Sequence, residues 1–149
     1  MKHHIVNGKI SGVEIKELST ICDERGYLYE VLRASDNYHF GQAYITAIHD
    51  GAIKAWHYHK LQYDCVCCIS GMIKMVLWDG TNLMEIFMGD NNRLLVKIPP
   101  NVYHGWKAYN GNAIVLNLPT KEYNNLSPDE YRKPYNTPDI PYNWDRVNK

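Results

Sequence analysis

The stretch GAIKAWHYHKLQYDCVCCISG, residues 51–71, decides the fold because it reads as two short strands joined by a turn. The runs IKAW and YDCVCCI are rich in apolar, β-branched and aromatic side chains, and a glycine closes the stretch at each end. Successive side chains of a strand alternate between the two faces of a sheet, so His57 and His59 point to the same side. The stretch therefore predicts β-structure that carries two imidazoles on one face.

Similar apolar or alternating runs occupy the chain on both sides, from about residue 13 to residue 118. Turn signals separate them, and we expect hairpin turns at DGT (79–81) and NGN (110–112), because glycine permits positive φ. No helical period occurs before about residue 125. Alternating strands need a second layer, or closure on themselves, to cover their apolar faces. The pattern predicts an all-β barrel or sandwich.

The chain of 149 residues has the length of one domain, which we expect to span residues 1–149. Within it we expect a strand region at 1–20, a barrel core at 21–118 and a C-terminal extension at 119–149. The extension is rich in Pro and Tyr, and SPDEYR (127–132) predicts one short helix with Ser127 as its N-cap and Pro128 in its first turn. Its aromatic content favours an ordered segment that wraps the barrel.

Charge and composition narrow the class of partner. The 16 basic and 16 acidic residues cancel, so the protein as a whole has no charge that favours nucleic acid or an anionic membrane. The N-terminus lacks the apolar region of a signal peptide, and no window approaches the roughly 18 apolar residues of a membrane span. We expect a soluble, cytoplasmic protein. Its cysteines, Cys22, Cys65, Cys67 and Cys68, are expected to be reduced and buried.

The histidine spacing resembles a known superfamily. Residues 51–71 read G-x5-H-x-H-x4-D-x6-G, which resembles the first motif of the cupins with Asp64 in place of the usual Glu, and PPNVYHGWKAYN (99–110) partly resembles the second. The resemblance implies a single cupin, or jelly-roll, barrel. His57, His59, Asp64 and His104 could hold one divalent transition metal, or they could be polar cavity residues satisfied by hydrogen bonds.

A wider resemblance points to one branch. Residues 23–57 contain DERG, FGQ and a histidine after AW, and they resemble the opening of the dTDP-4-dehydrorhamnose 3,5-epimerase family. IPPNVYHGW (98–106) and IPYNW (140–144) resemble its later motifs, so the likeness covers roughly residues 20–144. It implies a homodimer that binds a nucleoside-diphosphate 4-keto-6-deoxy sugar. It also implies an epimerase that acts without a cofactor, inverting carbons beside the ketone in polysaccharide precursor synthesis.

The resemblance also implies roles for single residues. His57 would be the base, with His59 as its partner, because an imidazole with a pKa of about 6.5 suits proton transfer near neutral pH. A further group would contact the substrate: Arg25, Gln42, Lys54 and His104, together with the neighbouring aromatic residues Tyr103 and Trp106. Arg and Lys would meet the diphosphate.

Departures from the family pattern leave more than one function open. In that family a lysine that follows the base neutralises the developing enolate; here its position falls on Asp64, whose negative charge would oppose an enolate. The family's proton-donating tyrosine falls on Asn117, and Tyr103 and Tyr109 are the nearby phenols. HYHK also resembles the H-A-H-K of nucleotide-sugar 3,4-ketoisomerases, in which two histidines move a proton between adjacent carbons. Two more hypotheses are a metal-dependent cupin enzyme of another reaction class and a non-catalytic cupin that binds a nucleotide sugar.

Overall fold

Two long antiparallel strands, β6 and β9, form the centre of the fold in this computed structural model, which describes residues 9–148. The strands are β1 (Glu14–Glu17), β2 (Thr20–Asp23), β3 (Gly26–Tyr29), β4 (Tyr44–Ile48), β5 (Ile53–Tyr58), β6 (Asp64–Trp78), β7 (Leu83–Gly89), β8 (Leu94–Ile98), β9 (Tyr103–Asn117) and β10 (Tyr131–Arg132). One 3-10 turn, η1 (Ala34–Asp36), is the single helical element among the described residues. The all-β prediction is confirmed.

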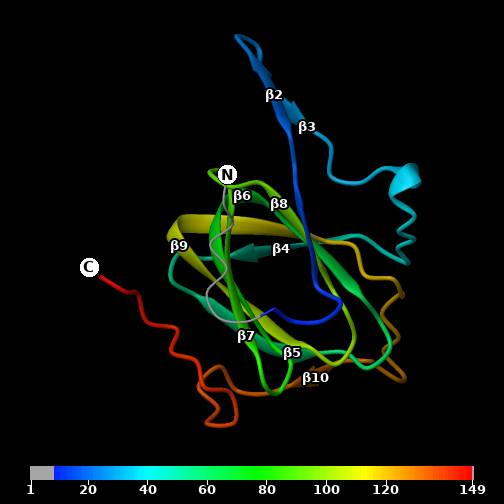
Figure 1. Cartoon of the computed structure of the whole chain (residues 1–149), viewed down its shortest axis with the longest axis vertical. Helices are drawn as coiled ribbons and strands as arrows, with labels where there is room; N and C mark the ends of the chain where they lie inside the picture. Colours follow the sequence, from blue (N-terminus) through cyan, green and yellow to red (C-terminus); the bar gives the residue numbers. More distant parts are fainter. Residues whose placement is uncertain (1–8, 149) are drawn as a thin grey trace.

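The ladder between β6 and β9 divides into two halves with different neighbours. The register shifts between Cys68 and Met72. On one side of that step β6 pairs with β8, which carries β1, and β9 pairs with β4. On the other side β6 pairs with β7, and β9 pairs with β5, which carries β10. The two halves form the layers of a jelly-roll barrel (Figure 1).

The two expected hairpin turns have different outcomes. DGT is confirmed as the turn between β6 and β7, where Asp79 accepts hydrogen bonds from the backbone of Thr81 and Asn82. The prediction for NGN is wrong, because β9 continues through it with positive φ at Asn110 and Gly111. The Asp50 carboxylate accepts from the Gly111 N–H, which ties this bend to the loop after β4.

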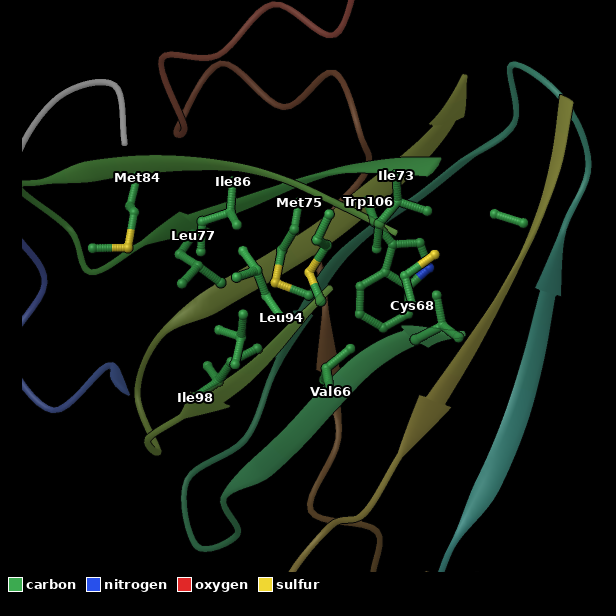
Figure 2. Packing of buried hydrophobic residues seen from close by; sticks show 14 of the residues in the cluster. Val66, Cys68, Ile73, Met75, Leu77, Met84, Ile86, Leu94, Ile98 and Trp106 are labelled. Carbon is green, nitrogen blue, oxygen red and sulfur yellow. The ribbon is translucent and has the colours of Figure 1, made fainter. Parts of the chain in front are cut away.

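The alternation predicted for β6 places its apolar side chains in two separate clusters. Val66 and Cys68 join the main core with Ile73, Met75 and Leu77 (Figure 2). Cys65 and Cys67 point to the other face and pack with Leu18, Leu95 and Leu118. All four cysteines are free thiols, and three are buried as expected, but Cys22 is exposed on β2. The burial expected for Cys22 is therefore wrong.

The C-terminal extension packs along the barrel but contains no helix among its described residues. The short helix expected at 127–132 is wrong, because tertiary contacts take up its residues instead. The Asp129 carboxylate accepts hydrogen bonds from the backbone of Lys60, Leu61 and Gln62, and Tyr131 and Arg132 pair with β5. Farther on, Ile140 and Trp144 pack against Trp56. These bonds hold the extension against the strand that carries His57.

A hairpin of β2 and β3 leaves the barrel and forms a sheet of its own (Figure 1). Tyr27 and Tyr29 on one face of this hairpin stack on each other, and the Arg93 guanidinium lies 4.6 and 4.8 Å from their ring centroids. Ile21 and Leu28, which pair on the opposite face, are exposed. We call residues 20–29 the arm. No helix in residues 9–148 has the length and apolar character of a membrane span.

Candidate active site

One cavity of about 920 Å³ opens between the strands that bear the histidines and the C-terminal extension. Seven of the residues expected at the site line it: Gln42, Lys54, His57, His59, Asp64, His104 and Trp106. They come from β5, β9, the start of β6 and the segments just outside β4 and β5. Because the lining residues range from Gln42 to Trp106, the folded barrel is needed to gather them around one space.

Two of the expected substrate contacts lie elsewhere in this chain. Tyr103 does not line the cavity and stacks on Tyr58, with ring centroids 4.6 Å apart. Arg25 lies at the tip of the arm, paired with Asp23, and its side chain is 86% exposed. Neither residue reaches the cavity of its own chain.

His57 lies on β5 directly opposite His104 on β9. Its Nδ1 atom is 3.2 Å from Glu130 Oε1, and because a carboxylate accepts hydrogen bonds, this contact assigns the proton to Nδ1 and a lone pair to Nε2. Burial, together with the nearby His104, lowers the pKa of His57 to about 4 despite the opposing effect of Glu130. A neutral imidazole with a free lone pair is suited to act as a base.

His59 and His104 converge on Asp64, which is 2% exposed. The Nε2 atom of each imidazole lies 3.1 Å from Asp64 Oδ2, and the Gln62 amide donates to Oδ1 at 3.0 Å. Burial alone would lower the pKa of His59, but its hydrogen bond to Asp64 and the charge of that carboxylate raise it. Burial likewise opposes the ionised form of Asp64, yet the two imidazoles hold its pKa well below the ordinary range. The carboxylate is therefore fully satisfied.

Backbone carbonyls fix the orientation of these two imidazoles. His59 Nδ1 lies 2.6 Å from the carbonyl oxygen of Asp129, and His104 Nδ1 lies 3.1 Å from that of Val102. Since a carbonyl only accepts, both Nδ1 atoms carry protons. Each Nε2 atom then either carries a second proton, which makes the ring cationic, or directs a lone pair at the place where Asp64 Oδ2 also points.

The second possibility, in which the Nε2 lone pairs of His59 and His104 point to the same place as Asp64 Oδ2, is the arrangement of a metal site. The ligand atoms of His59, Asp64 and His104 lie within 4.8 Å of one another, and histidines that bind metals commonly donate their other N–H to a carbonyl. Two imidazoles and a carboxylate suit a divalent transition metal. His57, a possible ligand by its spacing in the sequence, is not part of this cluster in residues 9–148.

Sequence reasoning missed three residues at the site. Glu130 and Asp129 belong to the segment expected to be helical, and they instead contact His57 and the loop after His59. Tyr44 on β4 lines the cavity, and its hydroxyl oxygen accepts a 2.8 Å hydrogen bond from Asn117 Nδ2. The two carboxylates gave no local signal, because SPDEYR reads as the start of a helix.

Cations also line the cavity. Lys54 donates to Thr46 Oγ1 at 2.8 Å, and Lys121 lines the cavity from the extension. Within residues 9–148 neither lysine forms an ion pair, whereas Arg132 and Lys133 are paired with Glu130 and Asp139. Two lysines without a carboxylate partner leave positive charge available to an anionic ligand.

This jelly-roll architecture and the internal histidine-lined cavity define a cupin barrel. The family model described as FdtA: WxcM-like, C-terminal matches residues 11–137. The chain is 34% identical over 145 residues to the spore coat polysaccharide biosynthesis protein SpsL of Bacillus subtilis (strain 168), covering 91% of this chain and 96% of the relative. The chain belongs to the WxcM-like, C-terminal (FdtA) family, which confirms the resemblance to sugar-nucleotide cupins.

Two further proteins extend this likeness. The chain is 32% identical over 147 residues to a probable low-salt glycan biosynthesis epimerase, Agl13 of Haloferax volcanii, covering 91% of this chain and 94% of the relative. The crystal structure of a dTDP sugar isomerase from Desulfovibrio desulfuricans G20 superposes with a TM-score of 0.85 at 27% identity, covering 93% of this chain and 94% of that one. Both similarities span nearly the full chain.

Proposed function

We propose that this protein is an epimerase or ketoisomerase that acts on a nucleoside-diphosphate 4-keto-6-deoxy sugar in the synthesis of polysaccharide precursors. The observation that carries the proposal is the pair of imidazoles in one cavity with different partners: His57 bonded to Glu130, and His59 bonded to Asp64. The names of the relatives, a glycan biosynthesis epimerase and a dTDP sugar isomerase, support the same reaction class.

The environments of the two imidazoles give them different tasks. The pKa of His57 is lowered by burial, so the ring is neutral and can remove the proton from the carbon beside the ketone. The pKa of His59 is raised, because Asp64 and Asp129 outweigh the effect of burial, so this ring can remain cationic. Titratable groups whose environments move their pKa values apart are a common basis for acid and base roles.

The cluster of His59, Asp64 and His104 also explains how a carboxylate can be present at a site that forms an enolate. A bare carboxylate near the developing enolate would raise the barrier, since catalysis requires donors or positive charge at that oxygen. Asp64 is instead buried and paired with His59 and His104, whose Nε2 atoms each lie 3.1 Å from its Oδ2 atom. A cationic His59 ring, whose pKa is raised, offsets the charge of Asp64. The enolate then has a cationic neighbour although the family's lysine is absent.

The first experiment measures exchange of the α-proton. Wild-type protein and the His57→Asn variant are incubated with dTDP-linked 4-keto-6-deoxy sugars in deuterated water, and deuterium in the sugar is followed by mass spectrometry. We expect incorporation with the wild type and none above background with His57→Asn. His49→Asn, at an exposed position outside the cavity, is the control. Exchange that persists in His57→Asn would contradict the assignment of the base.

A homodimer belongs to this proposal. The arm exposes Ile21 and Leu28 on its free face, with 72% and 60% of their surfaces accessible. Arg25, expected at the substrate, lies at the tip of the same arm and cannot act in its own cavity as the chain is arranged here. A second copy would cover the apolar face and receive Arg25. The cytoplasmic location expected from the sequence fits the free thiols and stays part of the proposal.

A metal-dependent reaction is the second candidate, because the orientations of His59, His104 and Asp64 also suit a divalent cation. When bound, such a cation would supply a Lewis acid for the keto oxygen. Elemental analysis of protein purified without chelator or metal affinity tests this candidate. About one equivalent of a transition metal in the wild type, lost in His59→Ala, would support it, and a metal-free protein that is active would oppose it.

A further inference from the structure

Tyr44 occupies a position that the sequence did not connect with the site. It is the first residue of β4, and its backbone pairs directly with that of Asn117 at the end of β9. Asn117 is the residue on which the family's proton-donating tyrosine falls. The two side chains meet, since Asn117 Nδ2 lies 2.8 Å from the Tyr44 hydroxyl oxygen. A phenol is thus present beside the place where the family pattern lost one.

The hydrogen bonds around Tyr44 leave its hydroxyl proton available. Asn117 is fully buried, and its Oδ1 atom accepts the backbone N–H of Cys65 at 3.1 Å, which fixes Nδ2 as the group that faces Tyr44. The phenol oxygen therefore serves as an acceptor in this contact. Among the hydrogen bonds between described residues, none has Tyr44 as the donor. Its own proton is free for a ligand in the cavity.

The surroundings keep Tyr44 in the protonated state that a donor requires. Burial raises its pKa, the Asn117 hydrogen bond opposes this rise, and the negative charges of Asp64 and Glu130 add to it. Although 41% of the residue's surface is exposed, the contact of its hydroxyl with Asn117 is partly buried. The phenol is thus neutral near pH 7 and is anchored at its oxygen.

The other candidate phenols are placed less well. Tyr103 and Tyr109, the nearby phenols by sequence, do not line the cavity: Tyr103 stacks on Tyr58, and Tyr109 packs edge-on against Phe87. Tyr123 lines the cavity from the extension but is 60% exposed, and within residues 9–148 no hydrogen bond anchors its hydroxyl. Tyr44 is the cavity phenol held by a buried neighbour.

We propose that Tyr44 is a catalytic residue, the acid that returns a proton to the sugar, an inference that rests on the proposed function. His57 Nε2 removes the proton from the carbon beside the ketone, and the C–H electron pair forms the enolate double bond as the carbonyl pair moves onto oxygen. The enolate carbon then takes the proton of the Tyr44 hydroxyl, the carbonyl re-forms, and solvent returns the proton from His57 to the phenolate. His57 lies on β5 and Tyr44 on β4, so the base and the acid reach the cavity from different strands. Inversion requires them to act on opposite faces of the sugar ring.

The test separates exchange from conversion in the variant Tyr44→Phe, which keeps the ring and removes the hydroxyl. With a dTDP-linked 4-keto-6-deoxy sugar in deuterated water, His57 still removes the proton, and the enolate is reprotonated on the same side. We expect deuterium incorporation into recovered substrate to stay within roughly threefold of the wild type, while inverted product falls about 100-fold or more. Thermal stabilisation by dTDP should be unchanged, which shows that the variant folds and binds.

The remaining outcomes decide against the inference. Wild-type conversion in Tyr44→Phe would overturn it, and so would a parallel loss of exchange and conversion, because that pattern indicates a binding or positioning role. A large loss of conversion in Tyr123→Phe but not in Tyr44→Phe would assign the acid to Tyr123. If the wild type itself gives neither exchange nor product with these sugars, the proposed function fails and the role of Tyr44 fails with it. Exchange by the wild type therefore distinguishes the two failures.

Discussion

Asp64 shows how the environment of one residue decides its effect on catalysis. An isolated carboxylate in a site that forms an enolate would destabilise the transition state. Here it is buried and contacts two imidazoles and the Gln62 amide, all within hydrogen-bonding distance. Removing the imidazoles would leave this buried charge without its two charge-balancing partners, which is far more costly than the intact cluster. Asp64 therefore orients His59 and His104 and does not face the substrate alone.

The lowered pKa of His57 leads to a prediction for the pH profile. Burial and His104 bring this pKa to about 4, and the neutral ring is the proposed base. Activity should therefore be lost only as the pH falls through about 4, whereas an ordinary histidine would lose half of it near pH 6.5. We expect kcat/KM of chelator-treated protein to be flat between roughly pH 5 and 6.5. An acidic limb centred near pH 6.5 would contradict this environment for His57.

The sequence could predict the histidines but not their partners. His57, His59, Asp64 and His104 follow from spacing, because residues two apart on a strand share a face and neighbouring strands bring the others close. Glu130 and Tyr44 reach the cavity from segments 73 and 13 positions away from His57. No local pattern links such positions, so their roles emerge only when β4 and the extension are placed against the barrel.

At the scale of single elements, a glycine can mark either a turn between strands or a bend within one strand, and the sequence does not distinguish the two. The sequence predicts separate strands on either side of Gly71 and a hairpin at NGN, but both lie inside continuous strands. A Cβ atom at Gly71 would lie 2.2 Å from the carbonyl oxygen of Asn112, so the glycine permits β6 and β9 to cross closely at their bend. A bend and a turn use the same residue types, and only strand pairing distinguishes them.

The extension is the clearest case in which tertiary contacts override local propensity. Ser127, Pro128 and the following acids fit the start of a helix, yet Asp129 satisfies three backbone N–H groups of another segment at 2.8, 2.9 and 3.0 Å. A carboxylate that accepts several backbone N–H bonds is stabilised more strongly than a carboxylate in the exposed first turn of a short helix. The same residue also holds His59 through its carbonyl oxygen.

These contacts make Asp129 a testable anchor of the site. Asp129→Asn removes the charge and replaces one acceptor oxygen with an NH2 group, which cannot accept from a backbone N–H. We expect the free energy of unfolding to fall by about 1 to 2 kcal/mol and kcat to fall as the loop that positions His59 loosens. Chemical denaturation and steady-state kinetics provide the two measurements.

A matched control separates this effect from a general loss of charge. Asp139 pairs with Lys133 at the exposed surface of the same extension, and such pairs contribute little to stability. Asp139→Asn should therefore leave both stability and kcat near the wild-type values. If the two variants behave alike, Asp129 does not anchor the extension in the way its hydrogen bonds indicate.

At the scale of the whole molecule, the arm is the feature that a single chain leaves unexplained. Its Tyr27 and Tyr29 face packs beside Arg93, while the opposite face presents Ile21 and Leu28 to solvent. Paired apolar side chains at the end of a projecting hairpin favour burial against another surface. The sequence predicts a barrel core at residues 21–118, a range that includes most of the arm. Alternation shows that a strand exists, but it does not show which sheet the strand joins. The domain boundaries themselves remain a prediction.

Association through the arm can be tested by changing its free face. Leu28→Glu places a charge among the exposed apolar residues, and we expect it to shift a dimer toward the monomer in size-exclusion chromatography with light scattering. Thr20→Glu introduces the same charge on the other face of the hairpin, where Thr20 pairs with Tyr29, and should leave the dimer intact. A wild type that is monomeric at all concentrations tested would contradict the dimer.

Mixing two defective proteins tests whether the arm also completes the site. Arg25→Ala retains His57 but lacks the cation, and His57→Asn retains Arg25 but lacks the base. If Arg25 acts in the cavity of the partner, a mixed dimer contains one cavity with both residues intact and one with neither. Activity should then appear on mixing and approach about a quarter of the wild-type value per chain, because half of the dimers are mixed and half of their cavities are complete. If Arg25 served its own cavity, each cavity of the mixed dimer would lack one residue, and mixing would restore nothing.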